Sequence, residues 1–275
     1  MTLRRRFLAG LAVLGLTLAT LAQPTPAQAE GESVLDRIQE RGALRVGVGA
    51  FVPWAFRSKS GEYIGFEVDV ATKLAEDMGV ELELIPTAWD GIIPALLTGK
   101  FDLIIGGMTV TPARNLRINF TNSYHTGLGQ DVVANRSLIE AGASVEDLNN
   151  PGTVIGVRRG AVSVQAAQQF FPLAELRQYD DEAVIQQELL AGNVALWVTS
   201  APKPAFAADN NPDELFRPFD DVLTKAVVGM GVVKGDFDTL NFLNNWISIN
   251  LNSGFLPERS TYWFGGQAWR DQVAN

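Results

Sequence analysis

The feature that most constrains the fold is an alternation of strand-like and helix-like segments in the first half of the chain. Short apolar segments at 43–48, 80–85 and 101–105 have the composition and length of buried or half-buried strands. Between them, segment 67–79 has apolar residues at helical spacing, and segment 91–99 follows Asp90, which we expect to cap a helix there. Because successive strands joined by crossover helices run parallel, this order predicts a mostly parallel α/β sheet.

The same order of elements occurs again in the second half. Strand-like segments at 152–157, 174–179 and 194–198 alternate with helix-like segments at 162–171 and 182–192. The architecture repeats but the sequence does not. We therefore predict two similar α/β lobes and claim no internal duplication.

Two extended, glycine-containing segments, 122–137 and 225–235, follow the first and the second set of elements. If they run antiparallel between the lobes, they form a two-strand hinge that returns the chain to the first lobe, which the remaining C-terminal part then completes. The predicted parts are lobe 1 at 30–128 plus 230–275, lobe 2 at 129–229, and hinge strands near 127–135 and 225–234.

The N-terminus has the pattern of a secretory signal peptide. Three arginines at 4–6 precede an apolar run at 7–21 and a small-residue cleavage pattern at 27–29. The run is short for a membrane span, and prolines follow it, so a retained anchor is the weaker alternative. We predict a signal peptide at 1–29, cleavage after Ala29 and a periplasmic location; the Sec and twin-arginine routes both stay open.

The composition argues against several classes of function. The formal charge is −9, and subtracting the three arginines of segment 1–29, its only charged residues, gives −12. Such an acidic chain is a poor ligand for nucleic acid or anionic membranes. There is no cysteine and one histidine, His125, which we expect to be structural although it could reach a ligand. We expect no catalytic residue, metal or cofactor.

Ligands of open parallel sheets bind beyond the carboxyl ends of the strands. In this chain Arg114 follows such a strand end, among threonine hydroxyls and loop amides. These groups together suit a carboxylate, to which a charge-assisted hydrogen bond contributes about 1.5–3 kcal/mol. The alternative is an ordinary surface arginine. If the lobes face each other, the cleft is lined by segments 49–54, 86–90, 106–114, 158–163, 179–181 and 199–203.

Several stretches in order resemble one known family. They are LRVGVGAFVPWAF (44–56), GEYIGFEVDVATKLAEDMG (61–79), WDGIIPALLTGKFDLIIGGMTVTPARNLRINFTNSY (89–124) and the final WFG (263–265). Together they resemble solute-binding proteins of polar-amino-acid ABC transporters, solute-binding protein family 3, in particular the glutamine-binding members. The resemblance implies a two-lobed periplasmic-binding-protein fold of type II that closes on one ligand. It also implies a membrane permease as partner, a monomer and no enzymatic activity.

The resemblance also implies roles for single residues of the first lobe. Arg114 matches the arginine that holds the ligand's α-carboxylate, Thr109 matches a hydroxyl on the same carboxylate, and Gly107 matches a backbone contact. Phe51 and Trp89 match two aromatic positions that enclose the ligand's side chain.

Five further residues complete the predicted ligand-binding set, and four of them, Arg158, Val162, Ser163 and Ser200, lie in the second lobe. Arg158 matches a residue at the cleft mouth, and Val162 and Ser163 match a loop that adds amide or hydroxyl donors. Trp54 lies near a strand end of the first lobe. With Phe51 and Trp89 it could hold an apolar body or surround a quaternary ammonium. Each of these aromatic side chains could instead belong to the core.

The sequence departs from the family at the residues that bind the ligand's ammonium. Ser200 stands where members usually have an aspartate, and Val48 where the glutamine-binding members have a second acid. An enclosed ammonium without a carboxylate loses several kcal/mol. Either another acid substitutes, with Asp90, Asp131 and Asp181 as candidates, or the ligand lacks a primary α-ammonium, which we favour.

Two rival functions remain. Some proteins of this fold are periplasmic cyclohexadienyl dehydratases, whose glutamate general acid aligns with Lys203. A lysine is a poor acid at neutral pH unless its pKa is strongly lowered, so we expect no catalysis. A sensor lobe that serves a receptor kinase is disfavoured by the lack of a second apolar run and of an output domain.

Overall fold

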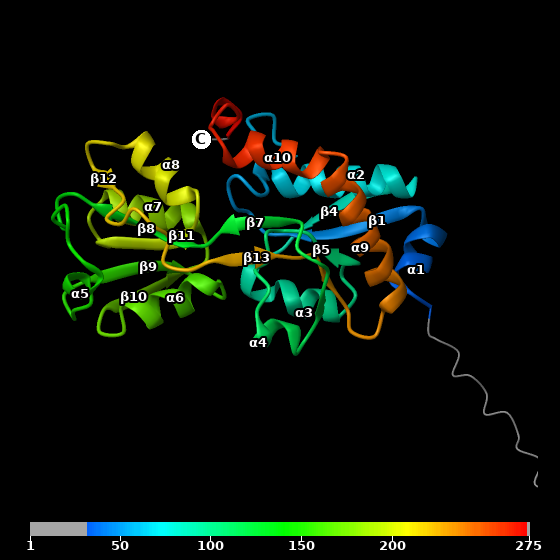
Figure 1. Ribbon diagram of the computed structural model, residues 1–275, viewed down its shortest axis with the longest axis horizontal. Helices are drawn as coiled ribbons and strands as arrows, with labels where there is room; N and C mark the ends of the chain where they lie inside the picture. Colours follow the sequence, from blue (N-terminus) through cyan, green and yellow to red (C-terminus); the bar gives the residue numbers. More distant parts are fainter. Residues whose placement is uncertain (1–31, 274–275) are drawn as a thin grey trace, which may run out of the picture. The chain divides into compact units, whose positions relative to one another are not determined.

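The computed structural model describes residues 32–273, which fold around two five-stranded sheets (Figure 1). The predicted signal peptide and its cleavage site lie outside the described residues. In the sheet of lobe 1, β1 pairs in parallel with β4 and β5, as predicted, and β14 pairs antiparallel with β5 and β6. Its spatial order is β4 (Glu81–Pro86), β1 (Ala43–Val48), β5 (Leu103–Ile104), β14 (Gly231–Val232) and β6 (Asn119–Phe120).

Helices surround this sheet and build the larger apolar core. The predicted helix at 67–79 is α2, which ends at Gly79 with a left-handed φ of 68°. The elements of lobe 1 outside its sheet are α1 (Val34–Arg41), β2 (Phe56–Arg57), β3 (Tyr63–Ile64), α2 (Phe66–Met78), η1 (Trp89–Gly91), α3 (Ile92–Leu97), α4 (Pro112–Asn115), α9 (Phe237–Asn252), α10 (Phe255–Phe264) and η2 (Arg270–Gln272).

One local prediction about these helices is wrong. We expected Asp90 to cap the helix at 91–99, but Asp90 lies inside the short 3₁₀ turn η1. The following helix α3 begins after Gly91 without a side-chain cap. The 3₁₀ turn moves the start of the α-helix past the aspartate, so that its carboxylate no longer precedes the first free amides.

Lobe 2 repeats the parallel arrangement. Strand β9 pairs in parallel with both β10 and β11, and β8 is antiparallel to β11 and β12. The strands in spatial order are β10 (Glu175–Tyr179), β9 (Val154–Arg158), β11 (Leu196–Ser200), β8 (Gln130–Asn135) and β12 (Leu215–Phe216). Its helices are α5 (Val145–Leu148), α6 (Val162–Phe170), α7 (Glu182–Leu190) and α8 (Lys203–Asn210).

Two antiparallel strands, β7 (His125–Leu128) and β13 (Ala226–Val228), run side by side between the two sheets (Figure 1). Next to β7, Gly129 permits a close approach of the two connections, because a Cβ atom there would lie 1.7 Å from the carbonyl oxygen of Thr224. The connection to lobe 2 continues as β8, and the returning one enters lobe 1 as β14. The residue limits given above for lobes and hinge stay a prediction.

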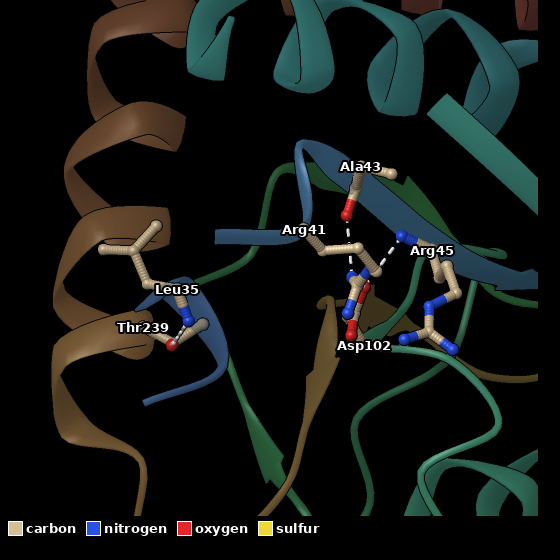
Figure 2. Close-up of polar contacts among 6 residues, drawn as sticks. All are labelled: Leu35, Arg41, Ala43, Arg45, Asp102 and Thr239. Atoms are coloured by element: carbon tan, nitrogen blue, oxygen red, sulfur yellow. Dashed lines mark hydrogen bonds and ion pairs between the residues drawn. The ribbon is translucent and has the colours of Figure 1, made fainter. Parts of the chain in front are cut away.

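Polar contacts hold the amino ends of the first sheet's strands in place (Figure 2). The carboxylate of Asp102 is ion-paired with Arg41 and accepts a hydrogen bond of 2.8 Å from the backbone N–H of Arg45. The N–H of Leu35 in α1 donates to the Thr239 hydroxyl of α9 at 3.0 Å. These contacts fix α1 and the amino ends of β1 and β5, which leaves the carboxyl ends for a ligand.

Candidate ligand-binding site

Arg114 connects loops of the two lobes. It lies in the short helix α4, whose N-cap Thr111 accepts a hydrogen bond from the Arg114 N–H. Its guanidinium donates from Nη1 to the Thr109 carbonyl at 2.9 Å and from Nη2 to the Gly160 carbonyl of lobe 2 at 3.2 Å. Burial lowers the pKa of Arg114 to about 10, so the side chain is a cation at neutral pH.

Arg158 reaches the same region from lobe 2. It ends strand β9 and is 5% exposed, and its Nε has no hydrogen-bond partner in the described part of the chain. Its guanidinium carbon lies 5.2 Å from the ring centroid of Trp89 and 5.8 Å from that of Phe51. Burial lowers the pKa of Arg158, and the charges of Glu182, Asp181 and Asp90 oppose that shift.

A guanidinium group from each lobe therefore lies near the Trp89 ring. Besides Arg158, the guanidinium carbon of Arg114 lies 5.8 Å from its ring centroid. Gly49, directly after β1, makes room: a Cβ atom there would lie 2.8 Å from the Trp89 ring and 3.4 Å from an Arg158 Nη atom. The carboxyl end of β1, the indole and two guanidinium groups thus meet at one place, to which four of the six segments expected to line the cleft contribute a residue.

Lys203 and Glu182 form a buried ion pair beside this place. Lys203 Nζ lies 3.2 Å from Glu182 Oε2, with the side chains 13% and 5% exposed. The Thr199 hydroxyl lies 2.9 and 3.0 Å from the two Glu182 carboxylate oxygens. The ammonium also lies 4.8 Å from the ring centroid of Phe51 in lobe 1. Burial lowers the pKa of Lys203, and Glu182 opposes the shift.

The sequence placed Lys203 in the cleft-lining segment 199–203 and at the position of a catalytic acid, but it did not indicate Glu182. A signal was present, because Glu182 begins the helix that follows the end of β10, among the strand ends expected to line the cleft. Its pairing with Lys203 depends on contact between the end of β10 and the start of α8, which no local pattern encodes.

Thr109, Arg114 and Val162 line one hollow together with Gly160, Gln130 and Thr224; its volume is about 1000 Å³. Ser163, one residue beyond Val162 in the first turn of α6, is 2% exposed, and its hydroxyl has no partner among the described residues. The structure thus brings the predicted loops of both lobes together around the Arg114 side chain.

The structure gives Trp54 and Gly107 supporting positions. Trp54 is 2% exposed and packs against the ring of Phe51 at a centroid distance of 6.2 Å. It therefore belongs to the core and supports Phe51, the candidate ligand contact, from behind. Gly107 has a left-handed φ of 67°, and a Cβ atom there would lie 2.8 Å from the Trp54 ring. His125 also packs in this aromatic core, where burial lowers its pKa to about 4.

Ser200 and two of the candidate acids already have partners. Gln130 donates from Nε2 to the Ser200 hydroxyl at 3.0 Å. Asp131 is ion-paired with Arg217 at 2.9 Å, and Asp181 accepts a hydrogen bond from the N–H of Ala183 at the start of α7. Asp90 is exposed. The buried carboxylate near the Phe51 ring is thus that of Glu182, which is paired with Lys203.

Two further properties bear on function. No helix among residues 32–273 is both long and apolar enough to cross a membrane. The same residues contain no group of three or more histidine, aspartate or glutamate side chains arranged to hold a metal ion.

The fold and the position of the site define a two-lobed binding protein of the periplasmic type. A family comparison agrees: residues 44–266 match the bacterial extracellular solute-binding proteins, family 3. The chain belongs to this family.

Characterised relatives include binding proteins and an enzyme. The chain is 29% identical to the L-cystine-binding protein TcyJ of Escherichia coli, over 85% of this chain and 87% of the relative. It is 27% identical to the cyclohexadienyl dehydratase of Pseudomonas aeruginosa, over 84% and 86%. A binding component of an ABC transporter from Wolinella succinogenes, solved with lysine, has 38% identity and a TM-score of 0.79, over 84% of this chain and all of that one.

Proposed function

We propose that the chain is the extracytoplasmic solute-binding component of an ABC importer. Its two lobes close on a small ligand that bears a carboxylate, an amino acid or a derivative that need not carry a primary α-ammonium. The observation that carries the proposal is the position of Arg114, whose guanidinium donates to carbonyls of both lobes at once. Family membership and the names of the relatives support the solute-binding role.

In this proposal the ligand's carboxylate takes the Arg114 donors that now reach the Thr109 and Gly160 carbonyls. The unpartnered Ser163 hydroxyl and the free amides at the start of α6 add donors from lobe 2, beside Val162. Phe51 and Trp89 contact the body of the ligand, while Gly107 and Trp54 fix their surroundings. A ligand that contacts both lobes stabilises the closed arrangement, which a membrane permease would then recognise. We propose a periplasmic monomer for this role.

The test is a thermal-shift screen on the chain from residue 30, which contains the whole compact unit 32–275. Its panel compares standard amino acids with dicarboxylates, aromatic acids and betaines. Because a ligand that binds only the folded state raises the melting temperature, a concentration-dependent rise with at least one carboxylate is expected. No rise with any carboxylate, at concentrations where a matched relative responds, would contradict the proposal.

A second function is kept because one relative is a cyclohexadienyl dehydratase and because of the environment of Lys203. Burial lowers the pKa of this lysine, which is the direction that a general acid at its position requires, while the ion pair with Glu182 acts against it. Incubation with prephenate distinguishes the two functions. Formation of phenylpyruvate that is lost in Lys203→Met would establish the enzyme, and a thermal shift without turnover would leave a binding protein.

A further inference from the structure

Two arginines at the candidate site lack a carboxylate partner. Arg114 and Arg158 form no ion pair with an aspartate or glutamate among residues 32–273, although six other arginines or lysines outside the site do. Both guanidinium groups nevertheless approach the same indole, that of Trp89, one from each lobe. Arg158 is buried and Arg114 is half-buried, and two such cations at one site are costly unless anionic groups join them.

The neighbouring cation, Lys203, occupies the place where a ligand's ammonium could bind. Its Nζ lies over the ring of Phe51 and pairs with Glu182, the buried carboxylate near that ring. Glu182 also lies within hydrogen-bond distance of the Thr199 hydroxyl, so its oxygens are already engaged. A ligand's ammonium would therefore meet a like charge instead of an open carboxylate.

Ser200 does not change the net charge that a ligand would meet at the site. Its hydroxyl is held by Gln130 and carries no charge. Near Trp89 and Phe51 the site thus presents three cationic side chains and one buried carboxylate that is already paired. Asp181 and Asp90 contribute charge near Arg158, but both are exposed to solvent, which screens them.

We propose that the ligand is a dicarboxylate without an ammonium group, with one acidic group on Arg114 and the second on Arg158, assisted by Lys203. This inference rests on the function proposed above and names the chemical class of its ligand. The rings of Phe51 and Trp89 contact the segment between the two acidic groups. The Lys203–Glu182 pair acts as a selectivity device, since the protein's own ammonium excludes that of an amino acid.

The experiment measures affinities by calorimetry for matched probes. Each dicarboxylate (glutarate, adipate and isophthalate) is compared with its monoamide, which has nearly the same shape and one charge fewer. Glutarate is also compared with glutamate, which adds only the α-ammonium. We expect at least one dicarboxylate to bind about tenfold to a hundredfold more tightly than its monoamide, and glutarate to bind more tightly than glutamate.

Arg158→Met should abolish the preference for the dicarboxylate over its monoamide, because it lowers the affinity for the dicarboxylate more than the affinity for the monoamide. The matched control is Arg159→Met, one residue further along, because Arg159 is exposed and paired with Asp180 at 2.8 Å. This control should keep the preference. Lys203→Met should unmask Glu182 and shift the selectivity from glutarate toward glutamate by about tenfold or more. Melting temperatures of all variants establish that they are folded.

Each outcome decides the inference. It is overturned if no dicarboxylate binds better than its monoamide, if Arg158→Met retains the preference, or if a standard amino acid binds more tightly than every dicarboxylate. In the last case, binding that still depends on Arg114 would leave the proposed function intact and remove only the ligand class. If no carboxylate binds at all, the proposed function fails as well.

Discussion

Replacing Glu67 by glutamine should remove a pH dependence from the stability of the folded chain. Glu67 is fully buried in α2 and accepts a hydrogen bond of 2.8 Å from the Tyr124 hydroxyl. Burial raises its pKa from 4.5 to about 8, although hydrogen bonds from Tyr124 and the Gly107 backbone oppose the shift. Gly107 follows β5 at the candidate site, so this carboxyl group supports a proposed ligand contact.

The sign and size of the effect follow from linkage. The folded protein keeps the Glu67 proton up to about pH 8, whereas the unfolded chain releases it near pH 4.5. The unfolded state thus binds fewer protons in this window, and the free energy of unfolding falls as the pH rises, by about 1.4 kcal/mol per unit. Over the whole window, 8 minus 4.5 units, the loss is about 5 kcal/mol.

The assay is urea unfolding followed by tryptophan fluorescence between pH 6.5 and 8, where the remaining titration of His125 in the unfolded chain contributes equally to both proteins. The wild-type chain should lose about 2 kcal/mol across this interval, and Glu67→Gln should lose almost none, since its amide can still accept from Tyr124 without ionising. An equal slope in both proteins would refute the assignment of the buried proton to Glu67.

Three other perturbations follow from the described contacts. As the pH falls from 6.5 to 4, His125→Phe should gain about 3 kcal/mol in free energy of unfolding relative to the wild type, because burial holds the pKa of His125 at about 4 and the opposing contribution of Glu67 is common to both proteins. Urea titrations at both pH values test this, and a difference between the two proteins that does not change with pH counts against it. Gly129→Ala should lower the free energy of unfolding by about 2–3 kcal/mol, because the added Cβ atom would meet the carbonyl oxygen of Thr224. Gly266→Ala, where the Cβ atom would enter open space, is the control. Equal changes in the two variants on chemical denaturation would contradict the expected clash. Phe206→Ala should weaken ligand binding about fivefold in calorimetry. Phe206 of lobe 2 packs edge-to-face on Trp269 of lobe 1, with ring centroids 5.7 Å apart, and this contact would stabilise the closed arrangement of the lobes. An unaltered affinity would mean that the contact does not stabilise the closed arrangement.

The sequence was sufficient for the arrangement of elements. The parallel strands at 43–48, 80–85 and 101–105 correspond to β1, β4 and β5, because short apolar segments separated by helix-length connections have few other solutions. Local capping was less predictable. Asp90 has the chemistry of an N-cap, but the 3₁₀ turn that precedes α3 is selected by the packing of Trp89, which a local pattern does not encode.

For the candidate site, the sequence indicated the loops but not the contacts between them. The expectation that Arg114 and Arg158 lie at strand ends required only the order of elements. The approach of both to Trp89 and the pairing of Lys203 with Glu182 depend on how the two lobes pack, and a one-dimensional pattern carries no information on that. Trp54 illustrates the same limit, because an aromatic residue near a strand end can face the cleft or support the residue that does.

The most direct test of the central claim is the affinity of wild-type protein and Arg114→Ala for the carboxylate that gives the largest thermal shift. Calorimetry on both proteins, with equal melting temperatures in the absence of ligand as the control, isolates the guanidinium from the fold. We expect Arg114→Ala to weaken binding by about tenfold to a hundredfold or to abolish it. Equal affinities in the two proteins would contradict the claim that the two lobes close on a carboxylate held by Arg114.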